Sequence, residues 1–92
     1  MLENSRIKNK VIGKALQEKR EVQNLTRTNV AEELGVKPQF VANWERGQCL
    51  PPKKIIPDLL KLYKMTPKEI VNLYTHATKL ALENYFNEIA VS

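Results

Sequence analysis

The 92-residue sequence has few of the residues that cross-link a chain, bind metal or catalyse reactions. Its single cysteine, Cys49, cannot form an internal disulfide, so we expect an intracellular, cytoplasmic protein. One histidine, His76, and one aspartate, Asp58, offer little for a metal site or for acid–base catalysis. No apolar run approaches the roughly 18 residues that a membrane helix needs. These shortages argue against an enzyme, a cofactor-dependent protein and a membrane protein.

Positive charge is in excess, and it is unevenly distributed. The chain contains 15 Lys+Arg against 10 Asp+Glu, a net charge of +5. Residues 1–65 hold 13 basic and 7 acidic side chains, whereas residues 66–92 hold 2 and 3. A basic body points to nucleic acid as the leading class of partner. Leu, Ile, Val and Phe supply 26 of the 92 residues, enough for one compact core.

The secondary-structure signals are all helical. No stretch alternates apolar and polar residues for long enough to predict a strand. Thr26 is a candidate N-cap, Gly35 a helix stop, and Thr66 to Glu69 form a capping box. Pro57 must lie in the first turn of its helix or break that helix. The expected helices cover residues 10–23, 27–34, 38–46, 55–64 and 67–90.

The segment 27–46 carries the strongest functional signal, because its two short helices flank the tight turn Gly35-Val36-Lys37. This spacing is typical of a helix-turn-helix. On a helical wheel, the apolar side that we expect to enter the core consists of Phe40, Val41 and Trp44. The outward side, which has no acid, consists of Pro38, Gln39, Ala42, Asn43 and Arg46. Glutamine and asparagine amides can pair with adenine in the major groove, and alanine can contact a thymine methyl.

Lys37 occupies the expected N-cap of the third helix, where a side chain with an acceptor oxygen is preferred. A lysine there also faces the positive end of the helix dipole. A bound phosphate or guanine would offset this cost. The alternative is that the helix starts elsewhere and Lys37 is only solvated.

Several segments between Ile12 and Ile70 follow one pattern without gaps. They are Ile12-Gly13-Lys14-Ala15-Leu16, Leu25-Thr26, Val30-Ala31-Glu32-Glu33-Leu34-Gly35-Val36, Val41-Ala42-Asn43-Trp44-Glu45-Arg46-Gly47, Pro51, Leu59 and Thr66-Pro67-Lys68-Glu69-Ile70. This pattern, over 59 of the 92 residues, resembles the phage-repressor/Cro-type helix-turn-helix family, also called the xenobiotic-response-element family. The resemblance implies an all-α, five-helix, lambda-repressor-like DNA-binding domain over residues 1–66. A long C-terminal helix over residues 67–92 would follow as a dimerisation arm.

The resemblance also implies roles for individual side chains. The third helix would enter the major groove, with base-reading positions at Lys37, Pro38, Gln39, Ala42 and Asn43. Phosphate contacts would come from Arg27, Arg46, Gln48, Lys53 and Lys54. A structural ion pair would link Arg20 to Glu45 and hold the third helix. Pro38 departs from the family pattern because it cannot donate a hydrogen bond, which increases the expected share of readout by DNA shape.

The last expected helix would span roughly 36 Å and overshoot a compact body. One apolar set on it, expected to dock on the body, consists of Ile70, Leu73, Tyr74, Ala77 and Ala81. A second set with heptad-like spacing consists of Val71, Thr75, Thr78, Leu82, Tyr85 and Ile89, with Phe86 beside it. From it we predict a homodimer interface made by Val71, Thr78, Leu82, Tyr85, Phe86 and Ile89. The alternative is that the helix bends back and fills its own core.

Together these observations predict a sequence-specific DNA-binding transcriptional regulator without a cofactor. The expected form is a repressor of the phage-repressor type that binds a palindromic operator in double-stranded DNA as a homodimer. A protein regulator is a further possible partner. The alternative hypothesis is an antitoxin-like or antirepressor module that binds another protein through its C-terminal helix.

Overall fold

The structure, a computed structural model, describes residues 2–91 and the side chains of residues 5–90. Met1 and Ser92, the outer limits of the two expected segments, lie outside this range. The helices in chain order are α1 (Leu2–Val22), α2 (Arg27–Leu34), α3 (Pro38–Glu45), the 3-10 turn η1 (Lys53–Ile55), α4 (Ile56–Tyr63) and α5 (Pro67–Val91). No strand occurs among residues 2–91, so the all-α prediction is confirmed.

Local capping explains why α2 has the bounds that the sequence predicts. The Thr26 hydroxyl accepts a 3.0 Å hydrogen bond from the Asn29 backbone N–H, and the Asn29 side chain accepts a 2.9 Å bond from the Thr26 N–H. At the other end Gly35 takes a left-handed conformation with φ 69°, which glycine adopts without steric cost. These contacts satisfy backbone groups that the ends of a helix leave unpaired.

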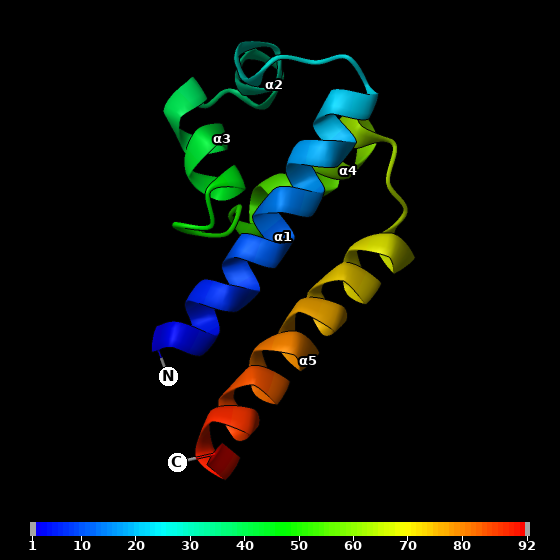
Figure 1. Cartoon of the computed structure of the whole chain (residues 1–92). Coiled ribbons are helices and arrows are strands. Elements are labelled where there is room, and N and C mark those ends of the chain that lie inside the picture. Colours follow the sequence, from blue (N-terminus) through cyan, green and yellow to red (C-terminus); the bar gives the residue numbers. More distant parts are fainter. Residues whose placement is uncertain (1, 92) are drawn as a thin grey trace.

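The first helix is longer than predicted. We expected it to start at Lys10, and it starts at Leu2. The sequence before Lys10 is mostly polar and has no apolar face to mark a helix, but it contains no Pro or Gly to stop one either. In the fold, α1 runs antiparallel beside α5, so that the first turns of α1 lie next to the last turns of α5 (Figure 1). The last turns of α5 therefore extend from the body together with the first turns of α1.

The core lies where α1 meets the other four helices. Its buried side chains include Ile12 and Leu16 of α1, with Val30, Val41, Trp44, Leu59, Tyr63 and Ile70 from the rest of the chain. Gly13 allows α1 and α3 to approach closely, because a Cβ atom there would lie 2.3 Å from the Trp44 carbonyl oxygen. Burial raises the pKa of the Tyr63 hydroxyl, and the nearby Glu45 charge adds to the effect, so Tyr63 stays neutral.

The inner stripe of α5 docks on α1 as predicted. Ala77 and Ala81 are buried, and Leu73 and Tyr74 are partly buried. Near the start of α5, the Lys19 ammonium of α1 lies 3.2 Å from a Glu69 carboxylate oxygen. The Glu69 side chain also caps α5, since its carboxylate accepts a 3.3 Å hydrogen bond from the Thr66 N–H. The side chains of Lys19 and Glu69 are both exposed to solvent.

Candidate nucleic-acid interface

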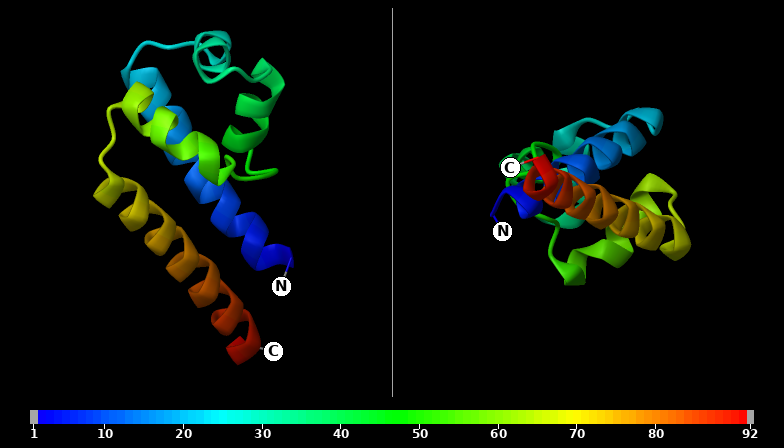
Figure 2. Two further views of the ribbon diagram at one scale, coloured as in Figure 1. Left: turned by 180° about the vertical axis from the view of Figure 1, so that it is seen from behind. Right: turned by 60° about the horizontal axis from the view of Figure 1, so that its bottom comes forward.

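The helix α3 lies on the opposite side of α1 from α5 (Figures 1 and 2). Its N-cap is Lys37, whose side chain makes no capping hydrogen bond, and Pro38 is its first residue. The helix therefore starts where the sequence predicts. The positive end of its dipole is left without an acceptor from the Lys37 side chain. A negatively charged group placed there would be stabilised.

The exposed side of α3 differs from the predicted one at two positions. Phe40, expected in the core, is 44% exposed, whereas Ala42, expected on the outward face, is only 7% exposed. The cause is Glu45, which is buried at 6% exposure next to Trp44. The helical wheel drawn from apolar residues did not include this acid on the buried side. Because it lies inside, the whole buried side of α3 is rotated toward Ala42.

The remaining outward positions lie where they were predicted. Pro38, Gln39 and Arg46 are exposed, and Asn43 is partly exposed. This side of α3 carries two amides and one guanidinium and has no carboxylate. Ala42 does not share this open face, so its assignment to base reading is corrected: its buried methyl group supports the packing of α3 instead.

An ionic network ties the buried side of α3 to α1 and α2. The Arg20 guanidinium donates to both carboxylate oxygens of Glu45, at 2.6 Å from Nε and 3.1 Å from Nη2. Its Nη1 donates to the Leu25 carbonyl at 2.8 Å. The hydrogen bond to Glu45 raises the pKa of Arg20, which keeps the guanidinium charged. The structure thus contains the ion pair that the family resemblance implies.

A second arginine joins this network, and the sequence did not indicate it. Arg27, the first residue of α2, donates from Nε to Glu45 Oε1 at 2.8 Å. Its side chain remains 35% exposed, compared with 2% for Glu45. One carboxylate therefore sits between two guanidinium groups and leaves one net positive charge. Arg27, which was expected to contact phosphate, is thus bound on its buried side by the carboxylate of Glu45.

The other residues expected to contact phosphate follow the C-terminal end of α3 in the chain. Arg46, Gln48, Lys53 and Lys54 are all exposed. Because α1 starts early, two basic residues that the sequence analysis did not assign, Arg6 and Lys10, lie next to Arg46 and Gln48. A groove of about 610 Å³ is lined by Ser5, Arg6, Asn9, Lys10, Arg46, Gly47 and Gln48. The i, i+4 spacing of Arg6 and Lys10 was the available signal, but it has meaning only once these residues are known to be helical.

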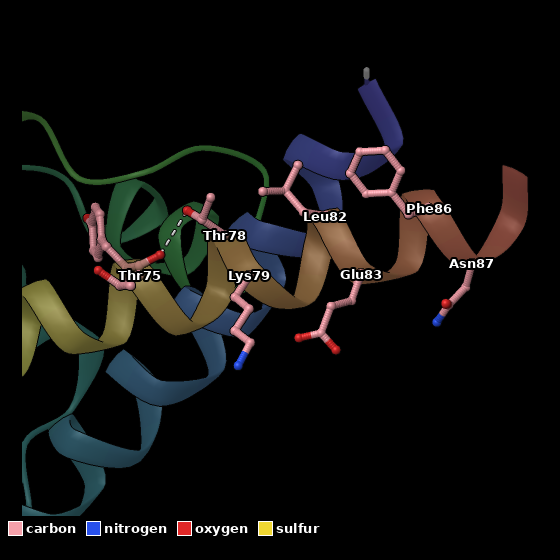
Figure 3. Close-up of a pocket in the computed structure, with 8 residues that line it drawn as sticks. Thr75, Thr78, Lys79, Leu82, Glu83, Phe86 and Asn87 are labelled. Atoms are coloured by element: carbon pink, nitrogen blue, oxygen red, sulfur yellow. Dashed lines mark hydrogen bonds between the residues drawn. The ribbon is translucent and has the colours of Figure 1, made fainter. Parts of the chain in front are cut away.

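The outer face of α5 forms a second candidate surface. Val71, Leu82, Tyr85, Phe86 and Ile89 are between 38% and 60% exposed. A groove of about 650 Å³ follows this face from Tyr74 to Asn87. Figure 3 shows Thr78, Leu82 and Phe86 along one side of it, and Thr75, Lys79, Glu83 and Asn87 along the other. The alternative that α5 folds back to cover this set does not hold, because only its inner stripe is buried.

Other chemistry-bearing residues form no cluster. Among the residues that the structure describes, no three His, Cys, Asp or Glu side chains are placed to hold a metal ion. Cys49 and His76 are exposed and stand apart from each other in the chain. Across the described range, none of the helices combines the length and apolar character that crossing a membrane requires.

Comparison with known proteins agrees with this architecture. The crystal structure of the clp gene regulator ClgR from Corynebacterium glutamicum is similar, with a TM-score of 0.68 and 18% sequence identity. The similarity covers 90% of this chain and 86% of that one, and at this identity it shows the fold. A search of curated proteins found no match. A family model described as a helix-turn-helix domain matches residues 11–73, which include α2, the turn and α3. The chain therefore belongs to the helix-turn-helix domain family.

Proposed function

We propose that this protein is a sequence-specific DNA-binding transcriptional regulator that acts as a repressor on a palindromic operator. The observation that carries the proposal is the exposed side of α3, which presents amides and positive charge without any acid. The ClgR neighbour is itself described as a gene regulator, which agrees with this role. The basic body of residues 1–65, with 13 basic against 7 acidic side chains, suits a polyanionic partner.

In the proposed complex, α3 lies in the major groove and reads bases from its first turns. Gln39 and Asn43 carry amides that can each donate to and accept from adenine. Lys37 at the open N-terminus suits either a guanine edge or a phosphate. Pro38 cannot hydrogen-bond to a base edge, so its contact with DNA would depend on the shape of the DNA.

Phosphate contacts fix the orientation of such a complex. Arg27 is suited to this role because the bond from its Nε to Glu45 orients the guanidinium while the side chain remains 35% exposed. Lys53, Lys54, Arg46 and Gln48 would follow the backbone beyond α3. The groove with Arg6 and Lys10 extends the same positive surface.

We further propose that two copies associate through the outer face of α5. An exposed apolar face of this length is stabilised by covering it. The charges beside the groove favour a second copy as the occupant. Lys79 and Glu83 lie one helical turn apart. In an antiparallel pair of α5 helices, Lys79 of each copy would therefore face Glu83 of the other, as a two-fold interface requires.

Selection from random double-stranded oligonucleotides at physiological salt tests DNA recognition. We expect enrichment of one motif repeated with two-fold symmetry. In the selected site, Gln39→Ala or Asn43→Ala should cost roughly 1–3 kcal/mol and relax the preference at particular bases. Arg27→Ala and Lys53→Ala should weaken binding to all sequences alike. Absence of enrichment would overturn the proposal, and uniform losses in all four variants would overturn the assignment of base-reading residues.

The exposed face of α5 also favours a second candidate function, an antitoxin-like or antirepressor module that binds a different protein. The two candidates differ in what the isolated protein does. A homodimer gives twice the chain mass in sedimentation equilibrium and selects DNA without any additional protein. A monomer that enriches no DNA would favour the second candidate.

A further inference from the structure

Phe40 of α3 has a partly exposed aromatic ring and lies outside the buried core cluster. Among the described residues, the large exposed apolar side chains outside α5 are Val22, at 72% exposure, and Phe40, at 44%. The neighbouring apolar residues of α3 are buried in the core, since Val41 is 0% exposed and Trp44 3% exposed. The exposed part of the Phe40 ring can therefore contact a ligand of α3.

The position of Phe40 is within the proposed base-reading surface. It is the third residue of α3 and follows Gln39 directly. Asn43 lies three residues further on, which places it on the same side of the helix. The N-terminal residues of a recognition helix are those that contact base edges. Along the helix axis Phe40 therefore lies between the two residues whose amides we assign to base reading, and around the helix it is the neighbour of Asn43.

Phe40 has no hydrogen-bonding group in its side chain, so the chemistry of its partner is limited. In the major groove, the apolar group that distinguishes one base from the others is the C5-methyl of thymine. Contact between the ring and this methyl would remove apolar surface of both from water. We propose that Phe40 is a specificity-determining residue that contacts the methyl group of a thymine in each half-site. The proposal rests on the proposed DNA-binding function.

This contact has a specific signature, because uracil presents the same hydrogen-bonding groups as thymine and lacks only the methyl. The test uses the full chain and the DNA site selected by the wild-type protein. Each thymine of a half-site is replaced in turn by deoxyuridine, and dissociation constants are measured by fluorescence anisotropy. Wild type should lose affinity at one thymine by roughly fourfold, the effect of burying one methyl group.

The Phe40→Ala variant should bind the thymine site more weakly and should no longer distinguish the two bases. Its affinities for the thymine and uracil forms should agree within about twofold. Gln39→Ala is the control on the same surface: it should weaken binding yet keep the thymine preference. Val22→Ala, a change at the far end of α1, should alter neither. Because Phe40 lies outside the buried core cluster, its variant should stay folded, which a thermal melting curve checks.

The outcomes separate this proposal from the function on which it rests. If wild type selects no DNA, the proposed function fails and the assignment of Phe40 fails with it. If wild type selects a site in which no thymine responds to the exchange, DNA binding stands and the Phe40 contact is overturned. A Phe40→Ala variant that still prefers thymine, or that loses equal affinity for both forms at an otherwise sensitive site, also overturns it.

Discussion

The helices α3 and α5 both rest on α1, but they are fastened to it by different chemistry. Two adjacent residues of α1 make the ionic contacts. Arg20 reaches Glu45 of α3 in a buried pair with side chains 10% and 2% exposed, whereas Lys19 reaches Glu69 of α5 in a pair 44% and 43% exposed. A buried pair is costly to break because one charge is left unpaired away from water, and a solvated pair is not.

The difference agrees with what each helix exposes on its other side. Apart from Pro38 and Phe40, the outward residues of α3 are polar or basic, and its position is fixed from within by Glu45 and by the close approach at Gly13. The outward side of α5 includes large exposed apolar residues, and its distal half contributes little buried surface. We infer that α3 is ordered before it meets a ligand, whereas the outer face of α5 is completed by association.

Breaking the buried network should have the largest effect on folding. Glu45→Ala leaves Arg20, which is 9% exposed, without its carboxylate partner. We expect the free energy of unfolding to fall by about 3–5 kcal/mol, as measured by urea denaturation at neutral pH. Lys19→Ala is the matched control, because it removes the neighbouring ionic contact of α1 at an exposed site.

Lys19→Ala should shift the urea midpoint far less than Glu45→Ala does. Equal shifts in the two variants would contradict the distinction between the buried ion pair that holds α3 (Arg20–Glu45) and the exposed one at α5 (Lys19–Glu69). A small effect of Glu45→Ala alone would mean that water enters the site and solvates Arg20.

Breaking the proposed partner surface should affect association more than folding. Leu82 is 47% exposed and lines the α5 groove, so Leu82→Glu would place a charge in the centre of the α5 seam. We expect a loss of at least about 2 kcal/mol of association free energy, seen as a shift to the monomer mass in sedimentation equilibrium. The thermal stability of the monomer should be nearly unchanged.

Charge exchange sharpens this test. Lys79→Glu should weaken the dimer by placing like charges opposite Glu83 of the second copy, and the double variant with Glu83→Lys should restore it. Restoration would support an antiparallel, two-fold arrangement. A Leu82→Glu protein with the wild-type mass would rule out the seam.

The local signals of the sequence predicted most of this fold. Thr26, Gly35 and the Thr66 capping box mark helix ends through contacts between neighbouring residues, so the bounds of α2 and the start of α5 could be predicted directly. The first turns of α1 could not be predicted, because their polar side chains show no amphipathic pattern and the helix continues beside a distant part of α5.

The candidate site was predicted less completely, for one physical reason. Whether a residue of α3 faces inward depends on the partner that it meets, and Glu45 meets Arg20 and Arg27 in the core region. Once an acid is buried, the helix is rotated relative to a wheel drawn from apolarity, so Phe40 is exposed and Ala42 is buried. The contact of Arg27 with Glu45 joins residues 18 apart in the chain and likewise depends on the tertiary fold.

A variant on the surface of the basic body should have a smaller effect, confined to DNA binding. Lys53→Ala removes an exposed charge that we place near the DNA backbone. Affinity should fall similarly for all sequences, and the slope of log affinity against log salt should decrease by about 1. Lys68→Ala, which removes an exposed charge at the start of α5, is the matched control and should leave the slope unchanged. Equal changes of slope would mean that both sides of the molecule approach DNA.

The smallest expected effect is on the pH dependence of stability that comes from the exposed Lys19–Glu69 ion pair. The hydrogen bond from Lys19, followed by that from the Thr66 backbone, lowers the pKa of Glu69. A carboxyl whose pKa is lower in the folded state stabilises the fold above its unfolded pKa, and this contribution is lost as pH falls through the folded pKa. Lys19→Ala should therefore raise the pKa of Glu69 toward its ordinary value of 4.5, as measured by NMR titration of the side-chain carboxyl. The stability difference between wild type and variant should be present at neutral pH and should vanish in acid, where Glu69 is protonated in both. An unchanged Glu69 pKa in the variant would show that the helix cap alone holds this carboxylate, and that α5 is joined to α1 only by its inner apolar stripe.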